Sequence, residues 1–212
     1  GRHPGRWSAC RERSPRERRR VYVSVKKPRR RRHGMVVRVA VNGFGRIGRN
    51  YLRCVLERAE GRGTPVEVVA VNDIAPAATL AHLLEYDSTY GRLGRPVGSE
   101  EGALLVAGRR IAVSSQRDPA GLDWRETGAD VIIEATGAFP RPGRRRAASE
   151  ERRGQGAAVG PGQEADATVV MGVNEDEYEP DRHHVVSCAS CTTNCVVPMV
   201  KVLHDAFGVR KG

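Results

Sequence analysis

The stretch VVRVAVNGFGRIGR, residues 36–49, decides the fold of this chain. Its first six residues are almost all apolar, which predicts a strand buried on both faces, as in a parallel sheet. Glycines follow, and from Ile47 to about Glu60 apolar side chains recur every three or four positions, which predicts a helix with one apolar face. The local pattern is therefore strand, glycine turn and helix.

A second strand at residues 66–71 completes a strand–helix–strand unit around this turn. Gly43, Gly45 and Gly48 form a G-x-G-x-x-G pattern between the first strand and the helix, where such a pattern has a structural role. The first glycine permits the tight turn, the second lets backbone approach a pyrophosphate, and the third allows close packing of the helix. We expect a dinucleotide-binding turn here.

Asp73 follows the second strand directly. A carboxylate at this position can accept hydrogen bonds from both ribose hydroxyls of an adenosine and would repel a 2′-phosphate, which favours NAD over NADP. The alternative is that Asp73 caps the turn before residues 74–76. Both interpretations stay open on the sequence alone.

Later segments extend the same pattern. Residues 77–84 predict a helix, residues 103–106 and 111–113 a hairpin turning at Gly108, and residues 131–137 another buried parallel strand whose end faces the cofactor. Together they predict an α/β fold: an incomplete, Rossmann-like, doubly wound parallel sheet over residues 35–189. Residues 190–212 would begin a second, catalytic domain.

The stretch SCTTNC, residues 190–195, places Cys191 where a strand at residues 184–187 gives way to a helix. The helix is predicted from about Cys191 to Phe207 and ends at Gly208, a residue suited to a left-handed cap. A thiol at a helix N-terminus faces the positive end of the macrodipole and unpaired N–H groups, which favour the thiolate and could hold an oxyanion or phosphate. The alternative is a buried structural cysteine.

Residues 1–34 form a basic tail. They hold 14 of the 36 lysines and arginines and 2 of the 25 acidic residues, so the other 178 residues, with 22 basic and 23 acidic side chains, are close to neutral. The tail has too little apolar surface to offset the entropy of ordering, so we expect it to be disordered. A solvated tail is the commoner outcome for such a run, and we do not expect a nucleic-acid partner.

The five cysteines make an odd set without a paired framework, which fits a reducing compartment and a cytoplasmic location. Cys188, Cys191 and Cys195 lack an evident fourth ligand, so we expect no metal. No run approaches the roughly 20 apolar residues of a membrane span, and residues 1–34 lack the apolar core of a signal peptide. We expect a soluble protein without a membrane partner.

A series of short motifs resembles the phosphorylating glyceraldehyde-3-phosphate dehydrogenase family in order and approximate spacing. The resemblance covers residues 35–139 and 165–212. The motifs are NGFGRIGR at residues 42–49, VND at 71–73, YDSTYG at 86–91, RDP at 117–119, ATG at 135–137, MGVN at 171–174 and SCTTNC at 190–195.

This resemblance implies that Cys191 attacks the aldehyde of glyceraldehyde 3-phosphate, that hydride passes to NAD, and that inorganic phosphate cleaves the resulting thioester. Ser190 and Thr192 would help to bind phosphate. In the family the chain forms a homotetramer, largely through the catalytic domain, most of which is missing from this sequence. The resemblance implies these cofactor-binding residues: Asn42, Gly43, Gly45, Arg46, Ile47, Gly48, Asp73, Arg117, Thr136 and Gly137.

The sequence departs from the family in three places. Residues 141–162 contain no readable helix or strand, although the family places both there, and compensating frameshifts are one hypothesis for this segment. Cys188 stands where the family usually has asparagine. The family's catalytic histidine is absent, and His204 lies 13 residues along the predicted helix from Cys191, roughly 20 Å away. We therefore expect this chain alone to be nearly inactive.

Two other functions remain open. Erythrose-4-phosphate dehydrogenase shares the cysteine motif, although residues 86–91 favour glyceraldehyde phosphate. A protein of another class, a non-catalytic nucleotide- or RNA-binding protein, would use the basic tail for electrostatic attraction and the sheet as a scaffold.

Overall fold

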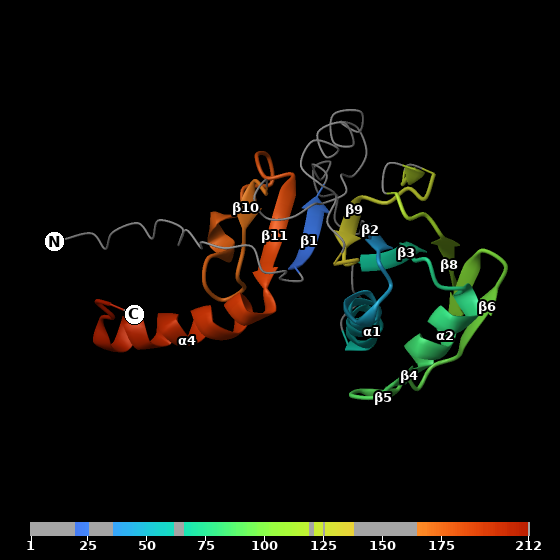
Figure 1. Ribbon diagram of the computed structural model, residues 1–212, viewed down its shortest axis with the longest axis horizontal. Helices are drawn as coiled ribbons and strands as arrows, with labels where there is room; N and C mark the ends of the chain where they lie inside the picture. The colour runs from blue at the N-terminus through green and yellow to red at the C-terminus, as the bar shows by residue number, and fades with distance from the viewer. Residues whose placement is uncertain are drawn as a thin grey trace.

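A computed structural model describes residues 20–25, 36–61, 66–118, 121–124, 126–137 and 165–211 (Figure 1). It is an α/β structure, as predicted. In chain order the strands and helices are β1 (Arg20–Val25), β2 (Val37–Asn42), α1 (Arg46–Gly61), β3 (Val66–Asn72), α2 (Ala77–Glu85), β4 (Tyr86–Asp87), β5 (Gly91–Arg92), β6 (Val97–Glu100), β7 (Ala103–Val106), β8 (Arg109–Ser114), β9 (Val131–Glu134), β10 (Ala167–Thr168), the 3₁₀ helix η2 (Glu175–Glu177), β11 (Val185–Ser190) and α4 (Cys191–Phe207).

Nine of the strands form one mixed sheet in the order β10-β11-β1-β9-β2-β3-β8-β7-β6. Its centre, β9-β2-β3-β8, is parallel throughout, with Val41 paired to Val71 on one side and to Ile133 on the other. The β7–β8 and β6–β7 pairs are antiparallel, as the predicted hairpin requires. The Rossmann-like centre is therefore confirmed within a sheet that is mixed rather than wholly parallel.

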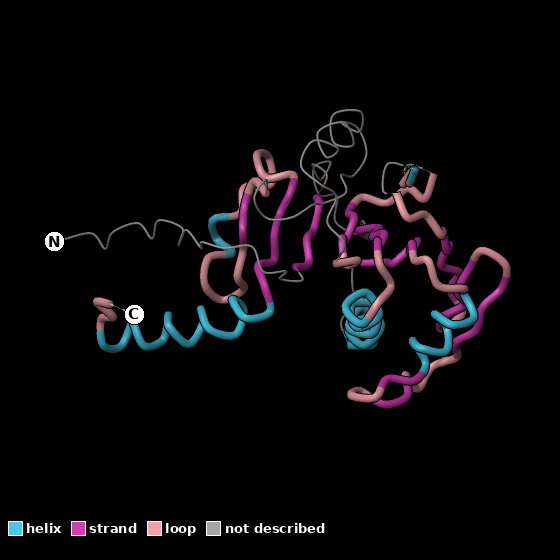
Figure 2. The backbone as a smooth tube through the Cα atoms, in the orientation of Figure 1, coloured by secondary structure: helices cyan, strands magenta, loops and turns pink. Residues whose placement is uncertain are grey.

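Apolar clusters cover both faces of this parallel centre. Successive residues of a strand point to opposite faces, so Val39 and Val41 of β2 join a large cluster with α1 and α2, whereas Ala40 joins a smaller one containing Trp124. Figure 2 shows α1 against one face of the sheet. Leu52, at 2 % exposure, anchors the helix in the larger cluster.

The strand β1 corrects the expectation that the whole basic tail is disordered. Its six residues pair antiparallel with β9 on one side and β11 on the other. The sequence RVYVSV contains three valines and a tyrosine, residue types that favour strands, and a strand there satisfies the backbone groups of both neighbours. The rest of the predicted tail and the atypical residues 141–162 lie outside the described residues.

The helix α4 differs from α1 in its surroundings. It begins and ends at the residues predicted, yet none of its side chains is buried. Leu203 is 50 % exposed and Phe207 is 83 % exposed. Figure 1 shows α4 projecting from the end of β11. Within the described part of the chain, no helix combines the length and apolarity needed to cross a membrane.

Candidate active site

The glycine turn between β2 and α1 is packed against the end of β9. A Cβ atom on Gly43, where φ is +91°, would lie 2.5 Å from the Thr136 backbone nitrogen, and a Cβ on Gly48 would lie 2.4 Å from the Gly43 carbonyl oxygen. Gly45 has nothing within 4 Å of the corresponding position. Two glycines thus allow close packing inside the protein, whereas the middle one faces open space where a ligand's phosphates could approach the backbone. The turn fits a dinucleotide.

Asp73 lies beside this turn and shows the capping role left open by the sequence. Its Oδ1 accepts a hydrogen bond from the Ala75 N–H at 3.0 Å, and its Oδ2 accepts one from the Phe44 N–H at 2.8 Å. The carboxylate is half-buried and therefore still reachable. Because each carboxylate oxygen can accept a second hydrogen bond, capping the turn does not exclude binding a ribose.

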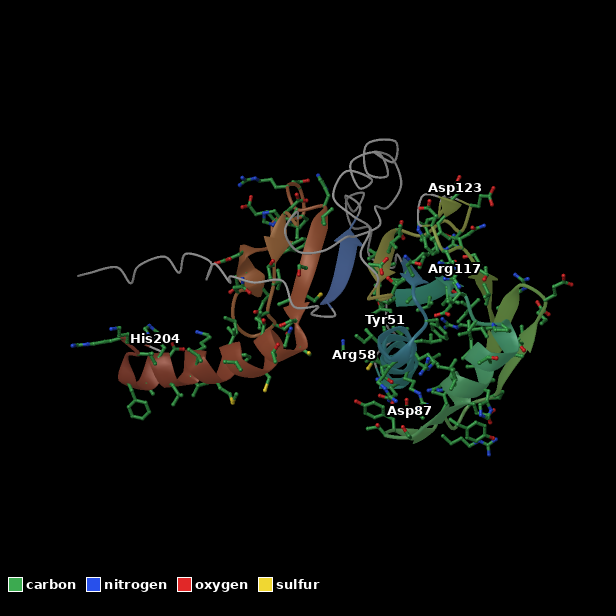
Figure 3. The ribbon with its side chains drawn as sticks, in the orientation of Figure 1. Tyr51, Arg58, Asp87, Arg117, Asp123 and His204 are labelled. Atoms are coloured by element: carbon green, nitrogen blue, oxygen red, sulfur yellow. The ribbon has the colours of Figure 1, made fainter. Side chains whose placement is uncertain are left out.

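Four of the other predicted cofactor residues are exposed at the same edge of the sheet. Arg46 and Ile47 begin α1, Thr136 follows β9, and Arg117 follows β8, where Figure 3 labels it. Gly137 also follows β9 and has a positive φ of 68°. The structure therefore brings these predicted residues together along the carboxyl ends of neighbouring parallel strands.

Asn42 is different from the other predicted residues because its side chain is only 1 % exposed. Its Nδ2 donates to Glu134 Oε2 at 2.6 Å, and its Oδ1 accepts from Asn72 Nδ2 at 2.8 Å. Cofactor binding by Asn42 stays a prediction; the residue is buried, and its carbonyl oxygen accepts the Ala135 N–H at 2.7 Å. Sequence reasoning did not single out Glu134 and Asn72, which in the structure are the last residues of the parallel strands β9 and β3.

Arg46 is held in place by Asp87. The Arg46 Nη1 atom lies 3.2 Å from Asp87 Oδ2, and the Asp87 carboxylate, beside α1 in Figure 3, also accepts the backbone N–H groups of Tyr90 and Thr89. Those two hydrogen bonds, from Tyr90 first and then Thr89, hold the pKa of Asp87 below its ordinary value, with a further contribution from Arg46. The YDSTYG motif thus positions an exposed guanidinium next to the glycine turn.

Cys191 is the first residue of α4 and is exposed, which contradicts the alternative of a buried structural cysteine. The residue before it, Ser190, caps the helix: its Oγ accepts the Thr193 N–H at 3.0 Å. Ser190 is 2 % exposed, whereas Thr192 is exposed with its hydroxyl 3.1 Å from Ser190 Oγ. Phosphate binding by Ser190 and Thr192 stays a prediction, in which Thr192 is the accessible member.

Cys188, the thiol that replaces the family's usual asparagine, lies half-buried in β11. Burial raises the pKa of its thiol, which makes it a weaker nucleophile at neutral pH. Asn194 binds the backbone here, because its Nδ2 donates to the carbonyl oxygens of Cys188 at 2.7 Å and Ser190 at 2.9 Å. The join between β11 and α4 is therefore tied by hydrogen bonds without an asparagine at position 188.

Cys191 and the glycine turn lie at the same edge of the sheet. The strand β1 runs antiparallel to both β11 and β9, and β9 runs parallel to β2, so β11 and β2 point the same way. Their carboxyl ends are three strand positions apart, roughly 14 Å at the usual spacing. His204 lies towards the other end of α4 from β11 (Figure 3), so it does not approach Cys191.

The described cysteines Cys54, Cys188, Cys191 and Cys195 are all free thiols. Over the described ranges, histidine, cysteine and acidic side chains do not gather in groups of three that could hold a metal ion. The described residues at this edge offer a thiol, hydroxyls, guanidinium groups, the Asp73 carboxylate and backbone N–H groups.

Comparisons with known proteins relate this chain to one family. The family model "Glyceraldehyde 3-phosphate dehydrogenase, NAD binding domain" matches residues 37–142, and the model of the C-terminal domain of the same family matches residues 190–212. A glyceraldehyde-3-phosphate dehydrogenase of Streptomyces coelicolor is 49 % identical over 182 residues, and one of Geobacillus stearothermophilus is 48 % identical over 180 residues; each alignment covers 84 % of this chain and 52 % of the relative.

The chain thus spans about half the length of the curated relatives that it matches. Its parallel strands and glycine turn correspond to the NAD-binding domain, and Cys191 falls within the match to the C-terminal domain. The chain belongs to the glyceraldehyde-3-phosphate dehydrogenase family, and NAD is the cofactor of its matched N-terminal domain.

Proposed function

We propose that this chain takes part in the NAD-dependent oxidation and phosphorylation of glyceraldehyde 3-phosphate, with Cys191 as the nucleophile. The observation that carries the proposal is the position of Cys191: exposed, first in a capped helix, and at the same sheet edge as the glycine turn. A helix N-terminus offers its thiol a positive dipole end and several backbone N–H groups.

The chemistry follows from what that thiol can do. The Cys191 thiolate adds to the aldehyde carbon, and the resulting oxyanion takes up a proton to give a thiohemiacetal. NAD, when bound, would supply the acceptor for the hydride of this carbon. As the hydride leaves, the hydroxyl proton is released to water, and the oxidised carbon remains on Cys191 as a thioester. Inorganic phosphate attacks its carbonyl, forms the acyl phosphate and releases the thiolate for another turnover.

The residues around Cys191 supply sites for the anionic groups in this sequence of steps. Free N–H groups of the first turn of α4 can stabilise the oxyanion of the adduct. Thr192 is exposed, and its hydroxyl would donate to a phosphate oxygen. The printed names of the relatives support glyceraldehyde 3-phosphate over erythrose 4-phosphate as the substrate.

The thiol assignment can be tested inside one molecule, because Cys195 lies one turn further along α4 and is also exposed. The full chain is treated with limiting iodoacetamide near neutral pH, and each cysteine peptide is followed by mass spectrometry. We expect Cys191 to be alkylated faster than Cys195. Equal rates, or a faster Cys195, would overturn the assignment of Cys191 as the activated nucleophile.

A second measurement separates the thiol from the cofactor. Titration of the chain with NAD by calorimetry tests the glycine turn directly, and a Cys191→Ser variant should bind NAD as the unmodified chain does. Failure of both proteins to bind NAD would contradict the cofactor part of the proposal without affecting the alkylation result.

A further inference from the structure

A buried chain of hydrogen bonds crosses the carboxyl ends of the four parallel strands. The last residues of β2, β3, β8 and β9 are Asn42, Asn72, Ser114 and Glu134, and all four are polar. Asn42, Asn72 and Glu134 are only 1 %, 3 % and 3 % exposed. Polar groups at this depth are costly unless each finds a partner, so their pairing determines what they do.

The pairing runs between two backbone donors. At one end the Gln116 N–H donates to Asn72 Oδ1 at 2.8 Å, and Asn72 Nδ2 donates to Asn42 Oδ1 at 2.8 Å. Asn42 Nδ2 then donates to Glu134 Oε2 at 2.6 Å. At the other end the Thr136 N–H donates to Glu134 Oε1 at 2.8 Å. The direction of every bond is thereby set, because a backbone N–H cannot act as an acceptor.

A row of hydrogen bonds that has an N–H donor at each end needs one side chain that only accepts hydrogen bonds. A side-chain amide accepts a hydrogen bond at its oxygen and donates one at its nitrogen. Between two N–H donors, a row made only of amides therefore leaves two donors facing each other at some point. A glutamine at position 134 would point its NH₂ group at Asn42 Nδ2 in one orientation and at the Thr136 N–H in the other. Turning Asn42 and Asn72 over only moves the conflict to Gln116.

Glu134 supplies the missing acceptor. Its carboxylate takes hydrogen bonds from the Thr136 N–H, the Thr136 hydroxyl and Asn42 Nδ2. Burial raises the pKa of Glu134, and the hydrogen bonds from Thr136 and Asn42 oppose that rise. An ionisable group is kept at a site that disfavours its charge, although a glutamine of the same size would avoid that cost.

Asn42, Asn72 and Glu134 of this row are each linked to a segment that is predicted to touch the cofactor. Asn42 precedes Gly43, Asn72 precedes Asp73, and Glu134 holds Thr136 directly. Backbone bonds link the same segments, because the Gly43 N–H donates to the Asn72 carbonyl at 2.8 Å. The buried row and these backbone bonds therefore link the glycine turn, the segment that carries Asp73 and the end of β9.

We propose that Glu134 is a positioning residue for NAD. It is the one side chain in the row Gln116–Asn72–Asn42–Glu134–Thr136 that only accepts hydrogen bonds, and it thereby fixes the direction of the row and holds the cofactor-binding segments in register. The proposal rests on NAD binding at this edge, as set out above. It assigns no contact with NAD to Glu134 itself.

The test moves the acceptor along the row instead of removing it. NAD affinity is measured by calorimetry for the full chain, for Glu134→Gln, and for the double variant Glu134→Gln with Asn42→Asp. In the double variant the glutamine accepts from Thr136 and donates to the new carboxylate, which in turn accepts from Asn72. Every donor is paired again. Glu67→Gln, the same change near the start of β3, is the matched control.

We expect Glu134→Gln to weaken NAD binding about tenfold or more, because one donor of the row, either Asn42 Nδ2 or the Thr136 N–H, loses its acceptor. The double variant should regain most of that loss, and Glu67→Gln should bind as the unmodified chain does. Unchanged affinity in Glu134→Gln would overturn the proposal, as would a double variant as weak as the single one. An unmodified chain that fails to bind NAD would instead contradict the proposed function.

Circular dichroism of each variant shows whether it folds, which matters if Glu134→Gln does not. If the double variant then folds and binds NAD, the requirement for a single acceptor holds. If the double variant also fails to fold, the size and position of the original pair matter more than the hydrogen-bond direction, and the proposal is wrong.

Discussion

Two units of this protein share one local plan, a strand that turns directly into a helix, yet they differ in what surrounds the helix. The β2–α1 unit buries Leu52, Val55 and Leu56 against the sheet, whereas β11–α4 leaves every residue of its helix at least partly exposed. Both helices begin within one residue of the predicted position. The difference shows that turn chemistry specifies where a helix starts, but packing decides how much it contributes to stability.

The turns themselves use different means. The glycine turn depends on close contacts between distant segments, since Gly43 meets the backbone of Thr136. The cysteine turn depends on neighbours in sequence, because the Ser190 hydroxyl accepts the Thr193 N–H and so caps α4. The other end of α4 is also local: Gly208 ends the helix with a φ of 70°. The first turn is thus tied to the fold of the sheet, while the second could form with little help from it.

The largest effect is expected at Gly43. In Gly43→Ala the new methyl group would overlap the Thr136 backbone at a residue with φ +91°. Overpacking and the left-handed conformation together should lower the free energy of unfolding by on the order of 4 kcal/mol. Urea denaturation followed by circular dichroism measures this loss.

Gly45→Ala is the matched control, since nothing lies within 4 Å of its Cβ position. Its free energy of unfolding should stay within about 1 kcal/mol of the value for the unmodified chain. NAD binding should weaken, because the methyl group enters the space for the phosphates. Equal destabilisation by the two alanines would show that the close contact at Gly43 is not what matters.

Truncation of one leucine in each helix tests the comparison directly. Leu52→Ala in α1 removes a side chain that is 2 % exposed, and should lower the free energy of unfolding by about 3 kcal/mol. Leu203→Ala in α4 removes one that is 50 % exposed, and should change it by less than about 0.5 kcal/mol. Thermal and urea unfolding of both variants give the two values. A large loss for Leu203→Ala would mean that α4 has a packing partner in solution.

A smaller effect is expected at the cap of α4. Ser190→Ala removes the acceptor of the Thr193 N–H and should cost about 1 kcal/mol, confined to the first turn of the helix. Hydrogen exchange at Thr193 measures it. Ser190→Asn should restore protection, because asparagine caps helices as well as serine does. Unchanged exchange in Ser190→Ala would contradict a cap maintained by this hydroxyl.

The smallest effect concerns acid stability near α1. The pKa of Asp87 is lowered chiefly by the Tyr90 and Thr89 N–H groups. The stability it contributes is therefore present above the ordinary carboxyl pKa of about 4, and is lost as the pH falls through the lowered value. Asp87→Asn should be less stable than the unmodified chain at neutral pH, with the difference shrinking in acid. Unfolding curves whose separation stays constant into acid would contradict this.

Much of the local structure could be predicted from particular residues. The apolar run before Gly43 indicated β2, and the end of the apolar strand before Cys191 together with Gly208 predicted the two ends of α4. The place of Cys191 as the first residue of a helix followed from the same boundary, whereas its exposure came from the structure. Capping, glycine turns and side-chain periodicity act over a few neighbouring residues, so a linear reading captures them.

Only the tertiary structure decided the rest. Asn42 and Glu134 are 92 positions apart, and they meet because β2 and β9 are neighbours in the sheet. The same strand order gave β1 a place between β9 and β11 that its basic surroundings argued against. The sequence by itself determined where strands turn into helices, because those signals are local. Which strand ends lie side by side, and which side chains are buried between them, depended on the strand order. Strand pairing brings together residues that are far apart in the sequence, and no local pattern relates them.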